Sequence, residues 1–484
     1  MINKPLVARM LAAVLLLEAL FMVPSLVISL LYGEGDAMAL VWSILALLLV
    51  GGVLRAVIRV KDNNLSARDG MVIASLTWVV LSAFGALPFV FSGVIPNYID
   101  AFFEAVSGFT TTGASIMTQI DGQPHGIMFW RSFTHWVGGM GVLVLFLSLM
   151  PKLSGRTSHL MRAESPGPTL SKILPKMGDT AKMLYIIYAV LTVLEFIILI
   201  GCGMNAYDAA IHAMGTAGTG GFSNYGASVA AFNSPAIEWV ITVFMVLFGV
   251  NFALFFQAIT GGWKNVLHNE ELRWYLGFFF VSVLIIAIQI LPLYSGFGEA
   301  VRYSGFQVAT IMSTTGYATT DFTAWPVNAQ MLLFLLMFVG SCAGSTCGGL
   351  KIVRVALVLK QMWREILHAI HPRKVKRISF ERSGVEEGLL HSVSVYTVLY
   401  IVLVLVGAVL IGLENKYDVL CNLTASLTCV SNVGPGLSPV IGPAGGFAGY
   451  GPFAKVVMSF LMLAGRLELF PMLIFLMPTI WKNV

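Results

Sequence analysis

Charged residues are scarce in this 484-residue sequence, and their scarcity excludes several classes of protein. Only 11% of the residues are Asp, Glu, Lys or Arg, whereas 57% are hydrophobic. Soluble domains carry about 25% charged residues, so a chain this apolar cannot cover its own surface with polar groups. Disorder is excluded too, because disordered chains have low hydrophobicity. A net charge of +5 spread over so long a chain indicates no nucleic-acid partner.

Clusters of metal-binding and catalytic residues are also lacking. The five cysteines form no CxxC pair and no cluster with histidine, so we interpret them as small apolar residues. No loop gathers catalytic carboxylates or histidines, and there is neither a GxGxxG fingerprint after a strand nor a Walker A motif. We therefore expect no enzyme activity and no organic cofactor. Any control by nucleotides must come from a separate polypeptide.

Long apolar runs are what the sequence has in abundance. A helix of about 20 residues crosses a hydrocarbon core of about 30 Å. Ten apolar stretches reach that length, and lipid would force them to be helical because it satisfies no backbone hydrogen bonds. They lie near residues 10–32, 38–58, 71–95, 127–150, 182–204, 236–259, 272–293, 327–350, 391–413 and 453–480.

Four shorter stretches lie between certain spans, near residues 97–110, 206–219, 300–314 and 418–431. A helix of 13 residues covers only about 20 Å, so it enters the membrane and returns. The 29 lysines and arginines lie at the termini or in the loops after spans two, four, six and eight, with five exceptions: Arg131, Arg302, Lys416, Lys455 and Arg466. The positive-inside rule then predicts cytoplasmic termini and four short stretches that all enter from outside.

The predicted organisation is two leading helices followed by four repeats of span, re-entrant stretch and span. The expected boundaries are 1–68 for the leading helices and 69–155, 156–268, 269–382 and 383–484 for the four repeats. Each short stretch ends in a polar segment that contains glycine, and the four segments recur at quasi-regular spacing on one predicted side of the membrane. The residues of interest are Thr111, Thr112, Gly113, Thr219, Gly220, Gly221, Thr314, Thr315, Gly316, Asn432, Val433 and Gly434.

These four segments together predict a cation filter. A dehydrated monovalent cation needs its water replaced by oxygens, which rings of backbone carbonyls supply when the backbone turns them toward one axis. Glycine permits the left-handed dihedrals that this requires. The short helices would also aim the partial negative charge of their C-terminal ends at that axis. The alternative is that each glycine merely ends a helix, although four such segments in register favour the filter.

The whole chain resembles the membrane subunit of bacterial potassium-uptake systems of the Trk/Ktr/HKT superfamily, specifically the Trk type with two extra N-terminal helices. The resemblance is carried by the four segments, by the run from Gly340 to Gly349, by His371-Pro372-Arg373 and by Gly465-Arg466-Leu467-Glu468. It implies an all-α membrane protein with ten transmembrane helices, four re-entrant pore helices and a pseudo-fourfold single-chain pore, similar to a tetrameric potassium channel. It also implies a bacterial inner-membrane location and a homodimer in the lipid bilayer.

The resemblance further implies K⁺ as the transported ion and a cytosolic ring of RCK-type nucleotide-binding subunits that docks on the chain. In plant relatives, serine at the first filter glycine accompanies sodium transport. Here that position is Gly113, so we expect potassium. Gly220 and the pair Asn432-Val433 depart from the family pattern, which leaves open how strictly sodium is rejected. Two further alternatives are a Na⁺- or H⁺-coupled carrier and a weakly selective Na⁺/K⁺ pathway.

A glycine-rich run interrupts the eighth span, where a regular helix would otherwise be expected. It comprises Gly340, Ser341, Cys342, Ala343, Gly344, Ser345, Thr346, Cys347, Gly348 and Gly349. Each glycine costs a helix about 1 kcal/mol relative to alanine. The run is therefore either a small-residue packing face or an unwound loop that lines a cavity. The resemblance implies that this loop is a gate.

Two charges in apolar surroundings have competing interpretations. Arg466 in the last span pairs with Glu468 or another helix, or it stands in the ion path below the filter as an electrostatic plug. Either interpretation places it away from lipid, because a charge at the bilayer centre costs about 2.5–3.5 kcal/mol. Glu104 either enriches cations at the outer mouth or, as we prefer, stabilises the start of its helix.

Overall fold

The computed structural model describes residues 2–60, 66–141, 177–373, 377–381 and 383–478. This part of the chain is mostly helical, and its strands are one short antiparallel pair, β1 (Ser379–Phe380) and β2 (Ser383–Gly384). The mostly helical, apolar fold agrees with the expected class of membrane protein.

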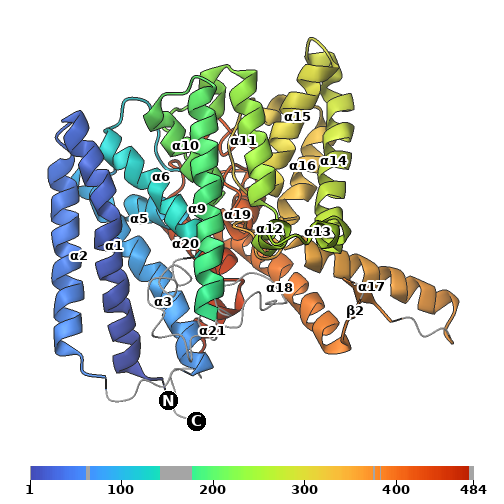
Figure 1. Ribbon diagram of the computed structural model, residues 1–484, viewed down its shortest axis with the longest axis horizontal. Coiled ribbons are helices and arrows are strands. Elements are labelled where there is room, and N and C mark those ends of the chain that lie inside the picture. The colour runs from blue at the N-terminus through green and yellow to red at the C-terminus, as the bar shows by residue number, and fades with distance from the viewer. Residues whose placement is uncertain (1, 61–65, 142–176, 374–376, 382, 479–484) are drawn as a thin grey trace.

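Two long helices form a hairpin at one edge of the molecule, α1 (Lys4–Tyr32) and α2 (Ala37–Val57) (Figure 1). The side chain of Asn3 caps the start of α1, and Gly33 ends it in the left-handed region with φ of 68°. The hairpin packs against α3 (Ala67–Gly85), α4 (Leu87–Phe91) and α6 (His125–Gly139).

The remaining helices are described in the order of the four predicted repeats, and each repeat has a short helix between two others. The first repeat continues with α5 (Tyr98–Phe109). The second has α9 (Met177–Gly201), α10 (Ala206–Gly218), α11 (Pro235–Phe248), α12 (Phe252–Ile259) and α13 (Trp263–His268). The third has α14 (Glu270–Ile290), α15 (Phe297–Met312), α16 (Val327–Phe338) and α17 (Ile352–Ile370). The fourth has α18 (Glu387–Gly412), α19 (Val419–Ser431), α20 (Pro452–Arg466) and α21 (Phe470–Leu476). In the described part of the chain, the 3₁₀ turns η2 (Ser228–Phe232), η3 (Leu291–Leu293) and η4 (Phe322–Ala324) lie in the connections.

Straight helices account for fewer membrane crossings than the apolar runs predict. Within the described residues, six helices are long and apolar enough to span, and a seventh span is possible if α11 and α12 count as one, although they meet at 93°. The second helix of each repeat is short: α6 ends at Gly139, α11 at Phe248, α16 at Phe338 and α20 at Arg466. A glycine lies within two residues of every one of these ends, where it weakens the helix.

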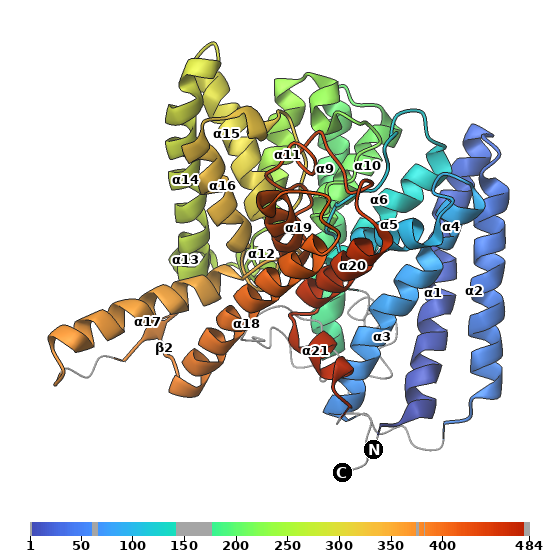
Figure 2. The same ribbon diagram turned by 180° about the vertical axis from the view of Figure 1, so that it is seen from behind.

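The total of ten crossings therefore stays a prediction. The fourth predicted span, 127–150, continues beyond residue 141 into a segment outside the described residues, and so does the expected repeat boundary at 155–156. The short helices α5, α10, α15 and α19 lie close to the bounds predicted for the re-entrant stretches. Two views show α17 projecting away from the body, while α1 starts at the end of the molecule where α21 lies (Figures 1 and 2).

Candidate functional site

The four short helices each lead directly into one of the predicted filter segments. Asn97, Asn205 and Asp418 accept backbone N–H groups at the starts of α5, α10 and α19. The last turns of all four helices are buried. Their C-terminal partial negative charge is therefore directed at the filter segments with little screening by water.

Left-handed backbone recurs at every second position of each segment. The four glycines have φ of 78°, 72°, 86° and 104° in chain order, and the residues two positions earlier have φ of 55°, 56°, 54° and 55°. Three of those earlier residues are threonines, for which this region is strained by about 1–3 kcal/mol. The residues concerned are Thr111, Gly113, Thr219, Gly221, Thr314, Gly316, Asn432 and Gly434.

Helix capping falls on the earlier residue of each pair and not on the glycine. After the left-handed residue, the next N–H reaches back five positions, as Thr112 does to the Ser107 carbonyl at 2.9 Å and Thr315 to the Thr310 carbonyl at 2.8 Å. The same bond joins Gly220 to Gly215 and Val433 to Thr428. This pattern is the Schellman motif, which is already complete before the glycine. The interpretation that the glycine only caps a helix is therefore wrong.

The four glycines lie in a closed ring. A Cβ added at Gly113 would come closer than 3.0 Å to the carbonyl oxygen of Gly220, and one at Gly221 would overlap that of Thr315 in the same way. A Cβ at Gly316 would meet the Val433 carbonyl oxygen, and one at Gly434 the Thr112 carbonyl oxygen. Each segment therefore presents the carbonyl of its middle residue to the glycine of a neighbour, and no side chain larger than hydrogen fits between them.

Side chains join the segments behind and across the ring. The amide of Asn432 donates to Thr112 Oγ1 at 2.9 Å and to the Met462 carbonyl at 3.0 Å, linking the fourth segment to the first and to α20. On one side of the ring, the outgoing chain of the four segments lines a cavity of 460 Å³. Tyr225 lies there and donates to Asp208 at 2.8 Å. Burial and then the Asp208 carboxylate raise the pKa of Tyr225 to about 12, so this phenol stays protonated.

The glycine-rich run of residues 340–349 lies on the opposite side of the ring and contains no helix. Two of its hydrogen bonds go to residues shortly before the third glycine of the ring: Gly348 N donates to Thr314 Oγ1 at 2.8 Å, and Ser341 Oγ donates to the Met312 carbonyl at 2.8 Å. Backbone bonds join Cys342 to Gly249 and Gly344 to Phe252, both at 3.1 Å. The loop is therefore held against the filter on one side and against the bend between α11 and α12 on the other.

Arg466, the last residue of α20, connects this loop to α6. Its guanidinium donates to the Thr346 carbonyl at 2.7 Å and to the Gly138 and Gly139 carbonyls at 2.6 and 2.5 Å. Glu468, which the sequence offered as an ion-pair partner, instead pairs with Arg354. That particular expectation is wrong, because the turn after α20 directs the glutamate toward α17 while the arginine faces the loop.

The family model described as a cation transport protein, TrkH, matches residues 37–482. The chain is 36% identical over 480 residues to the Trk system potassium uptake protein TrkH of Escherichia coli K12, covering 97% of each. The chain belongs to the TrkH family. Its family is one of cation transporters and not of enzymes.

Two further TrkH relatives extend the likeness over essentially the whole chain. The TrkH protein of Halomonas elongata is 35% identical over 495 residues, with 99% of each chain covered. The crystal structure of the potassium transporter TrkH from Vibrio parahaemolyticus matches with a TM-score of 0.88 at 32% identity, covering 99% of this chain and 100% of that one. The likeness to these TrkH proteins makes this chain a multi-pass membrane protein of the same fold.

Some residues around the loop of this TrkH-family protein were not identified by sequence reasoning. Lys351 is buried, and its ammonium donates to the carbonyls of Cys347 and Gly348 in the loop. Glu271 accepts the Ala343 N–H at 2.6 Å. Lys351 had been counted only as one of many cytoplasmic positive charges, and nothing in the local pattern distinguishes it. The bend between α11 and α12 could have been predicted, because Gly249 and the polar residue Asn251 interrupt an apolar run.

Glu104 has a different role from either sequence interpretation. It is fully buried in the middle of α5 and pairs with Arg131 of α6, Nε to Oε1 at 2.7 Å. It therefore neither faces the outer mouth nor stabilises a helix start. Asp100 in the first turn of α5 pairs with Lys455 at 2.6 Å.

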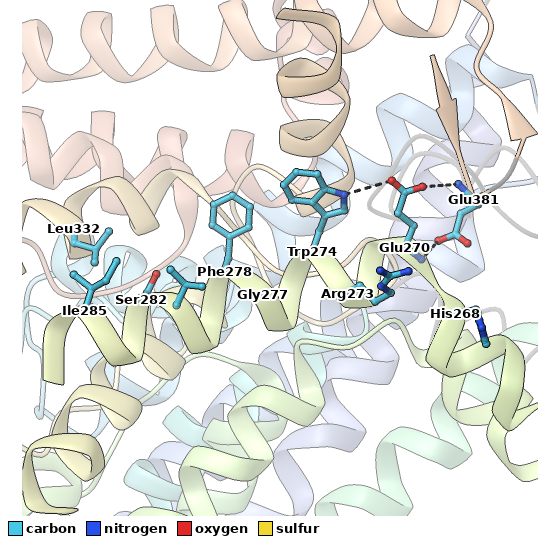
Figure 3. Close-up of a pocket in the computed structure, with 11 residues that line it drawn as sticks. His268, Glu270, Arg273, Trp274, Gly277, Phe278, Ser282, Ile285, Leu332 and Glu381 are labelled. Carbon is cyan, nitrogen blue, oxygen red and sulfur yellow. Dashed lines mark hydrogen bonds between the residues drawn. The ribbon is translucent and has the colours of Figure 1, made fainter. Parts of the chain in front are cut away.

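A separate groove of 760 Å³ lies away from the ring of four glycines, along α14. Charged residues, among them His268 and Arg273, line one end, and apolar residues, among them Phe278 and Ile285, line the other (Figure 3). Glu270 at the charged end pairs with Lys360 of α17, so the groove adjoins the base of the projecting helix.

Proposed function

We propose that this chain takes up potassium through the ring of four glycine-containing segments. The observation that carries the proposal is the alternation of left-handed residues in all four segments, together with the cyclic contacts between each glycine and a neighbouring carbonyl. Such a backbone aligns carbonyl oxygens in place of an ion's water. The relatives named above are potassium uptake proteins and a potassium transporter, and K⁺ is here the transported substrate.

The filter residues of the proposal are those of the four segments, with Thr111 of particular interest. Its hydroxyl oxygen is buried and has no hydrogen-bond partner in the described part of the protein. A buried hydroxyl without a partner is costly, unless water or an ion occupies the site. Gly113 supports potassium as the substrate, because the resemblance associates serine at this position with sodium.

The gate of the proposal is the loop of residues 340–349 together with Arg466. The loop contacts the third filter segment through Gly348, and Arg466 binds both the loop and the C-terminal end of α6. A fixed positive charge below the filter raises the barrier for a cation. Conduction therefore requires the loop and the guanidinium to move together away from the path.

The regulatory partner of the proposal is a cytosolic RCK-type ring that binds nucleotides. Support comes from the relatives, which are named as proteins of a Trk system, and from the basic segment around His371–Arg373 at the end of α17. The exposed helix α17 begins directly after the gating loop, since Lys351 precedes its first turn. Force applied to α17 by a docked ring would therefore reach the loop.

In the proposed homodimer, the interface between the two copies lies on the α17 side of the molecule. Met362, Trp363, Ile366 and Ile370 are each more than half exposed on a helix that otherwise carries basic groups. The groove along α14 adds apolar surface beside it (Figure 3). Apolar surface of this extent on a cytoplasmic helix favours a protein partner, and a second copy of the chain offers the same surface in return.

The proposed location of the protein is the bacterial inner membrane, with both termini in the cytoplasm. The start of α1 and helix α21 lie at one end of the molecule (Figure 1). Arg55 lies in the last turn of α2 and Arg59 follows that helix at the same end, as the positive-inside rule requires for a cytoplasmic face.

The test is uptake of rubidium-86 into proteoliposomes with competing potassium, sodium or caesium, for the wild type and for Gly113→Ser. We expect potassium to compete far better than sodium in the wild type, and the difference to shrink in the variant. Equal competition in the wild type would instead favour a weakly selective pathway. A reversal potential fixed by a second ion would favour a coupled carrier, whereas a pore follows the potassium gradient alone.

A further inference from the structure

The side chain nine positions before the filter glycine is polar in three of the four repeats. In each case it lies in the middle of the pore helix and is fully buried. The outgoing chain after the glycine runs back along the pore helix, so this position faces that returning chain. The four residues are Glu104, His212, Gln307 and Ala425 in chain order.

In the first repeat, the contact is made by a carboxylate. Ser115, two positions after the glycine, donates its hydroxyl to Glu104 Oε1 at 2.9 Å, and Ile116 donates its backbone N–H to Glu104 Oε2 at 2.9 Å. Both oxygens of a buried carboxylate are therefore used to hold the outgoing chain of the first segment. Hydrogen bonds to a charged acceptor are the stronger kind.

In the second repeat, a histidine makes the equivalent contact. His212 Nδ1 lies 2.8 Å from the Asp208 carbonyl, and its Nε2 lies 3.0 Å from Ser223 Oγ. Because a carbonyl only accepts, Nδ1 carries the proton and Nε2 accepts from the serine. Ser223, like Ser115, stands two positions after its glycine, and each serine Oγ also accepts the N–H two residues further on, at 3.1 Å.

The third repeat keeps only a weaker form of this contact, and the fourth repeat lacks it. Gln307 donates only to the Thr320 carbonyl at 3.3 Å, two residues beyond the position of the serines. The fourth repeat has Ala425, whose methyl side chain cannot form a hydrogen bond. There the outgoing chain contains Pro435 and is held by its own backbone, with Gly436 N donating to the Ile441 carbonyl at 2.6 Å.

One arginine joins the first and second contacts. Arg131 of α6 donates to Glu104 through Nε at 2.7 Å and to the Ser223 carbonyl through Nη1 at 3.0 Å. Its guanidinium carbon lies 3.5 Å from the centre of the Phe222 ring. Arg131 is 2% exposed and Glu104 is not exposed at all. The outgoing chains of two filter segments are thus tied through one buried ion pair.

We propose that Glu104, Arg131, His212, Ser115 and Ser223, here called the brace, are positioning residues that set the filter's discrimination between potassium and sodium. The inference rests on the proposed filter. The brace holds the chain immediately after Gly113 and Gly221, and therefore the spacing of the carbonyls that face those glycines. Sodium is smaller than potassium, so a ring that cannot contract leaves sodium incompletely coordinated. Loosening the brace lets the ring contract and admits sodium.

The test uses serine variants, because Glu104→Gln would leave a buried arginine unpaired and endanger folding. Ser115→Ala and Ser223→Ala each remove one hydroxyl, Ser115→Thr and Ser223→Thr restore it, and Ser82→Ala is the matched control. Ser82 is fully buried, and its hydroxyl bonds only to the Trp78 carbonyl of its own helix, at 2.8 Å. The readout is the ratio of sodium to potassium concentrations that halve rubidium-86 uptake, at equal amounts of folded protein.

We expect each alanine variant to lower this ratio by about fivefold, the effect of one net hydrogen bond, while the threonine variants and Ser82→Ala keep it. The double alanine variant should lower it by less than the product of the two single effects, since Arg131 couples the two contacts. A lower uptake rate with an unchanged ratio would overturn the proposal, because it would show a purely structural role. If Gly113→Ser also leaves the ratio unchanged, the filter itself is refuted; if only the serine variants do, the brace alone fails.

Discussion

The backbone N–H of Gly348 donates a hydrogen bond to Thr314 Oγ1, with 2.8 Å between nitrogen and oxygen. Thr314 is one of the three threonines with left-handed backbone in the proposed filter, and Gly348 belongs to the loop that interrupts the third repeat. A candidate filter residue and a candidate gate residue are thus in direct contact. Movement of the loop must break this bond or move the filter with it.

Replacing Thr314 by alanine should therefore release the loop. The change leaves the Gly348 N–H without its partner, at a cost of about 1–3 kcal/mol to the closed position. We expect rubidium-86 uptake by the protein without any regulatory subunit to rise by roughly fivefold. Thr314→Ser keeps the hydroxyl and is the control. Equal uptake by the alanine and serine variants would show that the bond between Gly348 and Thr314 has no role in gating.

Arg466→Ala should raise uptake further, because it removes both the positive charge and the bonds to Thr346, Gly138 and Gly139. Arg466→Lys distinguishes the two effects. Lysine keeps the charge but lacks the planar fork that bridges several carbonyls. We expect flux close to wild type for lysine and clearly higher flux for alanine in the same proteoliposome assay. A folded alanine variant with lower flux would show that the arginine only holds α20 to its neighbours.

Gly113→Ala should abolish potassium preference and lower stability, since the added methyl group meets the Gly220 carbonyl oxygen. The matched control is Gly122→Ala. Gly122 has nearly the same φ, 75°, but a Cβ there would meet nothing within 4 Å, so only a backbone strain of about 1–2 kcal/mol applies. Thermal unfolding in detergent measures stability and competition by sodium measures preference. Equal losses in both variants would show that strain alone is responsible.

Trp363→Glu should weaken the dimer. This side chain is 58% exposed on the apolar side of α17, and burying a charge there against a second copy is unfavourable. Glu365→Gln, at a 61% exposed side chain of the same helix, is the control. Light scattering of the purified protein in detergent should report more monomer for the tryptophan variant alone. An unchanged mass would exclude this side of α17 from the interface.

Much of the candidate site was predictable because local features specify it. The pore helices α5, α10, α15 and α19 lie close to their predicted bounds, since each is an apolar stretch of limited length with a polar segment directly after it. The spacing of Gly113 and its three counterparts also predicted that their segments meet at one axis, and the cyclic contacts between them agree with this. The interruption at residues 340–349 could be expected, because four glycines among small polar residues do not sustain a helix.

Other features depend on partners far away in the sequence. Glu468, two residues on, was one of the partners that the sequence offered for Arg466, yet the arginine binds carbonyls 120 and more residues earlier in the chain. Glu104 was assigned to a helix start or a pore mouth because nothing near it in sequence announces Arg131. Buried polar groups must find partners wherever the fold places them, and a single sequence does not show which groups will meet.

The scarcity of charged residues was thus enough to show that this is a membrane protein, because a chain with 57% hydrophobic residues needs lipid around it. Length and glycine spacing determined where short helices end and filter segments begin, because both are properties of the local chain. Only the tertiary structure decided that the second helix of each repeat stops short, that the four glycines close a ring, and that Glu104 and Arg131 support two of its segments from behind. These features arise from packing between distant segments, where backbone carbonyls and buried charges select their partners by proximity.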